Sequence, residues 1–164
     1  MKSSWDYKSE DLFVEKRKKI TIIASHFNGD ITQELVRSCE KTLREFGYSK
    51  SMVEILWTPG AWEIPQVGMK KAAVKALSEQ VDALIGIGCV IKGETPHFDF
   101  VAGEANRGLG EVARIAPFPV IFGILTTNTW KEAWARAAEG EGNKGREFAV
   151  SALYMINLFR RKNL

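Results

Sequence analysis

Short apolar segments rich in β-branched residues alternate along this chain with longer segments whose apolar residues recur at helical spacing. The apolar segments predict four strands, at residues 20–24, 52–57, 83–91 and 120–125. The longer segments predict helices at residues 30–46, from about 65, at 97–115, from about 130 and from about 145 to 159. This order indicates an α/β fold, because parallel strands need crossover connections and the helices then cover both faces of the sheet.

Turn and cap residues support several of these boundaries. Gly47 closes the first predicted helix, and Pro65 suits the first turn of the second. Thr129 and Glu132 have the spacing of a capping box for the fourth helix. Three glycines interrupt the chain before the last helix, at positions 140, 142 and 145.

The length of 164 residues suits one domain with a buried core. No internal repeat or linker divides the sequence, so we predict a single domain at residues 20–164 after a loose N-terminal arm, residues 1–19. The formal net charge of +3 is mild and far from the concentrated basic face of a nucleic-acid-binding protein. No nucleic-acid partner is therefore expected.

The cysteine and histidine content argues against a disulfide framework and against a metal site. Cys39 and Cys89 are the two cysteines, and they cannot build a metal site with the two histidines at these spacings. A reducing compartment is expected. No apolar run reaches membrane-spanning length, and the first nineteen residues lack the apolar core of a secretory signal. These features predict a cytoplasmic protein without a membrane partner.

Ligands of parallel α/β sheets bind beyond the carboxyl ends of the strands, where loops lead into helices. Four such loops are unusually rich in polar and aromatic side chains, at residues 25–28, 58–65, 88–97 and 126–128. Phe27 and Trp62 could stack on a planar ring, although aromatic residues at loop ends often only cover the core.

The third loop is the most informative. Residues 93–96 lead directly into a helix, whose free N–H groups and dipole favour an anion such as phosphate. His97 stands at the same point and can exchange a proton near neutral pH, or it can simply cap or pack at the helix start. His26 is better explained as a structural or surface residue. Gly86-Ile87-Gly88 lies inside a strand and lacks a third glycine, so it is not a dinucleotide fingerprint. The pattern alone predicts an enzyme-like pocket for a phosphorylated ligand.

Five segments of the chain, between about residues 20 and 158, resemble the lumazine synthases. They are residues 26–28, 59–65, 88–99, 119–127 and 142–145. The resemblance implies a transferase that condenses 5-amino-6-(D-ribitylamino)uracil with 3,4-dihydroxy-2-butanone 4-phosphate to 6,7-dimethyl-8-ribityllumazine. This is the penultimate step of riboflavin biosynthesis. The alternative is a non-catalytic flavin- or lumazine-binding or shell-forming protein of the same fold, which has no need of His97 together with Arg136.

The same resemblance implies roles for thirteen residues. His97 would be catalytic and shuttle protons. Phe27 would stack on the pyrimidine, and Glu63 would accept hydrogen bonds from the ribityl hydroxyls. The further residues implied at the pyrimidine and the ribityl chain are Ala61, Trp62, Cys89, Val90, Ile91, Phe122 and Lys144. Those implied at the phosphate are Glu94, Thr95 and Arg136. Phe122 and Arg136 would come from a neighbouring subunit, and neither a metal nor an organic cofactor is implied.

The resemblance further implies a flavodoxin-like three-layer sandwich with a four-stranded parallel sheet, to which an N-terminal strand shared with a neighbour could be added. Lumazine synthases form pentamers, some of which assemble into icosahedral shells, and association with riboflavin synthase is a further implied partnership. Shell-forming members commonly carry Gly-Thr-Lys-Ala-Gly-Asn where this chain has two acids and no lysine, at residues 138–143. This departure puts shell assembly in doubt.

Overall fold

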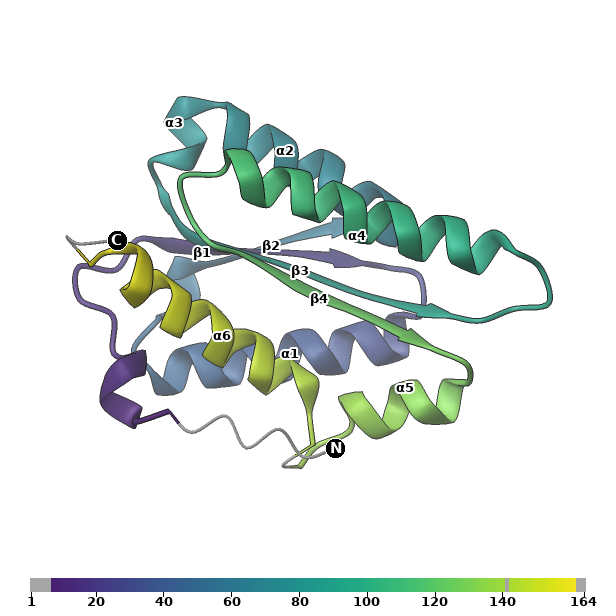
Figure 1. Cartoon of the computed structure of the whole chain (residues 1–164). Helices are drawn as coiled ribbons and strands as arrows, with labels where there is room; N and C mark the ends of the chain where they lie inside the picture. The colour runs from purple at the N-terminus through teal and green to yellow at the C-terminus, as the bar shows by residue number, and fades with distance from the viewer. Residues whose placement is uncertain (1–6, 141, 162–164) are drawn as a thin grey trace.

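Four parallel strands form the central sheet of the computed structural model, which describes residues 7–140 and 142–161 (Figure 1). The strands lie in the order β2-β1-β3-β4. Their bounds are Lys19–Ser25 for β1, Val53–Thr58 for β2, Val81–Ile91 for β3 and Val120–Thr127 for β4. All three pairings are parallel, which confirms the predicted α/β architecture of a flavodoxin-like sandwich.

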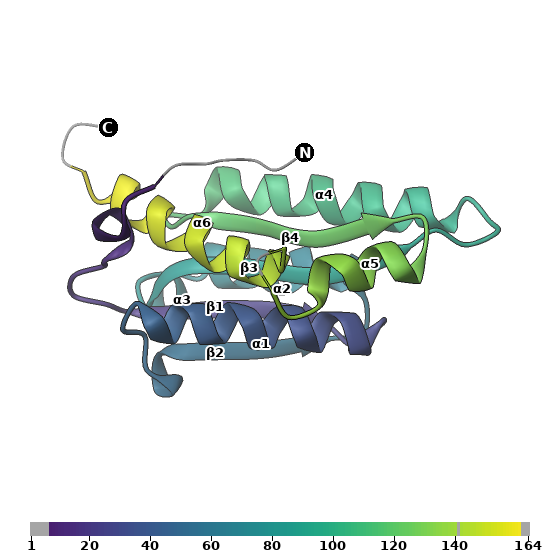
Figure 2. The same cartoon turned by 90° about the horizontal axis from the view of Figure 1, so that it is seen from below.

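Helices cover both faces of this sheet. One face carries α2 (Ile64–Ala73), α3 (Lys75–Ser78) and α4 (His97–Ile115), and the other carries α1 (Gly29–Glu45), α5 (Trp130–Ala137) and α6 (Lys144–Phe159) (Figures 1 and 2). No helix in the described part of the chain is both long and apolar enough to span a bilayer.

The core is divided between the two faces because neighbouring side chains of a strand point to opposite sides. Ile22 and Ile85 are fully buried under α1 and α6, whereas Ile23 and Leu84 are fully buried in the cluster on the other face. β3, which lies between two other strands, is buried over its first nine residues. It therefore forms the buried centre of the sheet, from which the loop between β3 and α4 starts.

The predicted helix boundaries agree closely with the structure, with two differences. The short helix α3 was not predicted, because its four residues are too few to show helical periodicity. The expected capping box before α5 forms only in half: the Glu132 amide donates to the Thr129 hydroxyl, but the Glu132 carboxylate accepts from the Asn128 amide. Gly47 has the left-handed φ of 90° expected for a helix-closing glycine.

The described part of the predicted N-terminal arm, residues 7–19, packs against the domain and is not loose. Leu12 and Val14 are fully buried, and the Asn157 amide of α6 donates to the Asp11 and Phe13 carbonyls. This part forms a short 3₁₀ helix, Ser9–Leu12, and no strand before Lys19, where β1 begins. Three parts of the predictions lie outside the described residues. They are residues 1–6 of the predicted arm, residues 162–164 of the predicted domain, and residue 141 of the acidic segment.

Candidate active site

The carboxyl ends of the strands meet at one edge of the sheet, where all four arrowheads point in Figure 1. The loops after β1, β2 and β3 and the start of α4 enclose a pocket of about 800 Å³ there. This volume lies in the range of small-molecule sites. The lining residues are Phe27, Pro59, Gly60, Ala61, Trp62, Glu63, Cys89, Val90, Ile91, Gly93, Thr95, His97, Phe98, Phe100 and Val101.

The loop after β1 presents an aromatic ring to this pocket. Phe27 is 70% exposed, although its backbone amide is fixed by a hydrogen bond of 3.0 Å to the Pro59 carbonyl. The amide of His26 is fixed in the same way by the Thr58 carbonyl, and the His26 ring stacks on Trp57 at 5.0 Å. An exposed ring on a fixed backbone can serve as a stacking platform for a planar ligand.

The loop after β2 is stabilised by its own polar groups. The Thr58 hydroxyl donates to the Gly60 carbonyl at 2.9 Å, and the Gly60 amide donates to Oε2 of Glu63 at 2.9 Å. Glu63 therefore has a fixed orientation at the pocket. Trp62, which is 44% exposed, forms the adjoining wall.

β3 brings its backbone to the pocket. An added Cβ at Gly86 would lie 2.8 Å from a methyl carbon of Leu109, so this position is glycine because α4 packs closely there. Cys89 is 2% exposed, and burial, aided by the negative charge of Asp30, raises the pKa of its thiol to about 12. Burial therefore disfavours the thiolate, which is the nucleophilic form of cysteine.

The loop between β3 and α4 places His97 at the first position of α4, exposed and lining the pocket. Pro96 precedes it as the N-cap and makes no side-chain cap hydrogen bond. The start of a long helix favours an anion, and Gly93 and Thr95, just before α4, line the pocket there.

Nine of the thirteen predicted site residues line this one pocket. Glu94 belongs to the same loop, between Gly93 and Thr95, but is not among the lining residues. Phe122, Arg136 and Lys144 lie on β4, α5 and α6, and they too are absent from the lining of this pocket. In the single chain, the guanidinium of Arg136 donates to the Glu132 carbonyl of its own helix at 2.8 Å.

Six lining residues were not among the predicted site residues. Pro59, Gly60 and Gly93 lie within loops that the sequence already indicated. Phe98, Phe100 and Val101 belong to the first turns of α4. Val101 could have been found from its spacing, because it lies four residues after His97 and so on the same helix face.

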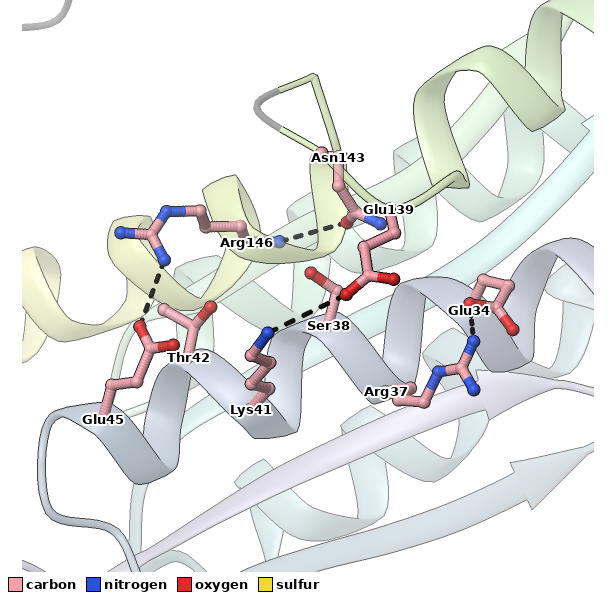
Figure 3. A pocket seen from close by; sticks show the side chains of 10 residues that line it. Glu34, Arg37, Ser38, Lys41, Thr42, Glu45, Glu139, Asn143 and Arg146 are labelled. Carbon is pink, nitrogen blue, oxygen red and sulfur yellow. Dashed lines mark hydrogen bonds and ion pairs between the residues drawn. The ribbon is translucent and has the colours of Figure 1, made fainter.

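A second cavity, of about 690 Å³, lies on the face of the sheet that carries α1 and α6. It is lined by α1, the start of α6 and the segment after α5 (Figure 3). Its basic side chains are paired with acids. Arg37 pairs with Glu34, and Arg146 pairs with Glu45 at 3.1 Å. Lys41 lies 3.9 Å from Glu139. Because these charges are matched, the cavity has less to offer an anionic ligand than the pocket at the carboxyl edge.

The fold and the carboxyl-edge pocket define an α/β protein with a site suited to a planar, anionic small molecule. The sequence profile of 6,7-dimethyl-8-ribityllumazine synthase matches residues 17–160. The 6,7-dimethyl-8-ribityllumazine synthase of Gemmatimonas aurantiaca is 43% identical over 144 residues, which cover 88% of this chain and 85% of that protein. The chain therefore belongs to the 6,7-dimethyl-8-ribityllumazine synthase family.

Family membership confirms the resemblance identified in the sequence and the prediction of an enzyme of riboflavin biosynthesis. Neither match favours the alternative of a non-catalytic binding or shell-forming protein. Small-molecule substrates are consistent with the family and with the pocket. Among the described residues, no group of three or more His, Cys, Asp or Glu side chains is placed to hold a metal ion.

Proposed function

We propose that the carboxyl-edge pocket condenses 5-amino-6-(D-ribitylamino)uracil with 3,4-dihydroxy-2-butanone 4-phosphate, releasing phosphate and water. The observation that carries this proposal is the convergence of nine predicted residues, from three loops distant in sequence, on one pocket. Their chemistry suits two substrates, one flat and hydroxylated and the other phosphorylated.

The pyrimidine substrate is proposed to bind between the first three loops. The exposed ring of Phe27 stacks on the pyrimidine, and the backbone groups of residues 89–91 bind its polar edge. Ala61, Trp62 and Glu63 line the ribityl chain. Because Oε2 of Glu63 already accepts the Gly60 amide, Oε1 is the carboxylate oxygen that we assign to the ribityl hydroxyls.

The ketone phosphate is proposed to bind at the start of α4. The Thr95 hydroxyl and the backbone of Glu94 donate to the phosphate, and the helix dipole adds a favourable field. The Glu94 side chain is exposed and can point away from the dianion. The imidazole of His97 then lies beside both substrates.

Arg136 and Phe122 are proposed to complete the pocket across a subunit boundary in a pentamer. Supporting this, both lie outside the pocket of their own chain, and Phe122 is exposed on the edge strand β4. Arg136 of a neighbour would bind the phosphate bidentately, and Lys144 would lie close to the pyrimidine. The acidic residues within 138–143 argue against further assembly into a shell. We also propose association with riboflavin synthase and a cytoplasmic location.

The proposed reaction needs proton transfers but no electron transfer. The amine of the pyrimidine condenses with the ketone to an imine with loss of one water, phosphate is then eliminated, and the second nitrogen closes the ring with loss of a second water. Holding the two substrates together can lower the activation free energy, by on the order of 7–11 kcal/mol in the best intramolecular cases. A positioned histidine adds roughly 10²–10⁴-fold.

A direct assay tests this proposal. Purified protein is mixed with both substrates, and lumazine formation is followed by absorbance and fluorescence against a blank without protein. The wild type should exceed the blank clearly, and Arg136→Ala should lower kcat/KM by about 10–100-fold through loss of charge-assisted hydrogen bonds. Arg114→Ala, an exposed arginine near the end of α4, is the matched control and should retain full activity. A wild-type rate equal to the blank would contradict catalysis and favour a binding or shell-forming role.

A further inference from the structure

Asn28 occupies an unusual backbone position between Phe27 and the start of α1. Its φ of 55° and ψ of 45° lie in the left-handed region. Among the described residues, Asn28 and Lys16 are the non-glycine residues with positive φ. A non-glycine residue there costs on the order of 1 kcal/mol or more, and such positions are retained where surrounding contacts fix them.

Asn28 is the N-cap of α1, but its side chain does not cap the helix. An asparagine at this position ordinarily accepts a hydrogen bond from an N–H of the first turn. Here the side-chain amide instead donates to the carbonyl of Cys89, 61 residues away, at 2.9 Å. Helix capping therefore does not explain the asparagine.

The carbonyl of Cys89 lies where the ladder between β1 and β3 has ended. The last pair of that ladder is Ala24 with Ile87. Beyond this pair, the segment after β1 turns toward the loop after β2. There the amides of His26 and Phe27 donate to the carbonyls of Thr58 and Pro59. On this side of β3, the Asn28 amide supplies the donor that the β1 backbone no longer offers. The Asn28–Cys89 bond is partly buried, and leaving this carbonyl without a donor would destabilise the folded state.

We infer that Asn28 is a positioning residue for the pyrimidine substrate. The left-handed turn at Asn28 sets the direction of the Phe27 ring, and the Asn28 amide holds the backbone at Cys89. Together they keep a constant distance between the Phe27 ring and the backbone groups of residues 89–91, which are proposed to bind the pyrimidine. This inference rests on the proposed binding of the pyrimidine by Phe27 and residues 89–91. It assigns Asn28 no contact with the reacting atoms.

Two variants separate the side-chain bond from the backbone conformation. Asn28→Asp keeps size and tolerance of the left-handed region but replaces the donor with a carboxylate that repels the Cys89 carbonyl. Asn28→Gly keeps the backbone conformation and removes the amide, and it decides the question if the aspartate variant does not fold. Asn157→Asp is the matched control, because the Asn157 amide also donates to distant backbone carbonyls, those of Asp11 and Phe13, away from the pocket.

The readout is the KM for each substrate in the lumazine assay, together with product affinity from fluorescence titration. Both Asn28 variants should raise the KM for the pyrimidine about tenfold, as loss of a partly buried hydrogen bond predicts, and should leave the KM for the ketone phosphate within about twofold. Asn157→Asp should lower the melting temperature and leave both KM values unchanged.

An unchanged KM for the pyrimidine in a folded Asn28 variant would overturn the inference, as would an equal rise for both substrates. In either case an active wild type would leave the proposed function standing. A wild type no faster than the blank would instead reject the proposed function, whatever the Asn28 variants do.

Discussion

At the amino edge of the sheet a buried carboxylate is surrounded by donors, whereas at the carboxyl edge aromatic rings stand exposed around a pocket. Asp82 accepts hydrogen bonds from the Lys18 amide at 2.6 Å, the Tyr48 hydroxyl at 2.9 Å and the Arg160 guanidinium at 2.6 Å. At the other edge, Phe27 and Phe100 are 70% and 68% exposed. The first arrangement holds segments of the chain together, and the second leaves surface for ligands.

Hydrogen bonds at the amino edge join the N-terminal arm to the end of α6. Arg160, at the end of α6, also donates to the carbonyls of Glu15 and Lys16 in the N-terminal arm. Burial raises the pKa of the Tyr48 hydroxyl, and the negative charge and hydrogen bond of Asp82 raise it further, so this tyrosine remains a donor. A buried charge is tolerated because each of these donors faces it.

The carboxyl edge lacks such a cluster in the described part of the chain and relies on backbone-directed bonds. Thr58, Glu63 and Asn28 each fix a loop carbonyl or amide. The difference indicates that stability and ligand binding are assigned to opposite ends of one sheet. Variants at the two edges should therefore change different measurements.

The largest expected effect is at the carboxyl edge. His97→Ala should lower kcat by roughly 10²-fold or more, because a positioned general acid-base is lost, while the melting temperature stays near that of the wild type. His26→Ala is the matched control, since this exposed histidine stacks on Trp57 and does not line the pocket. Its activity should stay within about threefold, since exposed residues away from the chemistry usually have small effects. Equal losses in the two variants would break the assignment of proton transfer to His97.

The next effect is at the amino edge. Asp82→Ala should lower the free energy of unfolding by about 2–4 kcal/mol, because it leaves buried donors without their acceptor. Urea denaturation at neutral pH measures this change. Glu79→Ala, in an exposed pair with Lys75, should change stability by less than about 0.5 kcal/mol. A changed KM or kcat in Asp82→Ala, measured at temperatures where the variant is folded, would contradict the assignment of stability and ligand binding to opposite edges.

The smallest effect concerns the acid limit of stability. Burial alone would raise the pKa of Glu54 on β2, but hydrogen bonds from Lys71 and Thr21 outweigh it and hold the pKa below the usual 4.5. A lowered carboxylate pKa stabilises the folded state above the unfolded pKa, and this contribution is lost as the pH falls through the folded value.

Glu54→Gln should therefore be less stable than the wild type at pH 7, by under about 1 kcal/mol because the side chain is partly exposed. The difference should vanish in denaturation curves measured below the folded pKa. A difference that persists unchanged at such low pH would show that packing, rather than charge, explains the effect.

The fold could be predicted from the sequence in most respects because periodicity and caps are local signals. The predicted range 97–115 coincides with α4, His97–Ile115. The packed arm could not be predicted, since its bonds to Asn157 and Arg160 join residues about 145 positions apart. The same holds for the bond between Asn28 and Cys89.

Pocket-lining residues were predictable where loops carry the family pattern and less so elsewhere. Phe27 and residues 61–63 and 89–91 line the pocket as a group. Phe98 and Phe100 were missed, because aromatic residues in a helix are as readily explained by packing as by binding. Phe122 and Arg136 do not line this pocket in the single chain, and the role proposed for them requires a second chain.

The most direct measurement is an experimental structure of the protein crystallised with the product 6,7-dimethyl-8-ribityllumazine and inorganic phosphate. We expect the lumazine ring to lie against Phe27 with its edge at residues 89–91, and phosphate to lie near Thr95 at the start of α4. Product bound instead in the charged cavity between Arg37, Lys41 and Arg146, with the carboxyl-edge pocket empty, would contradict it.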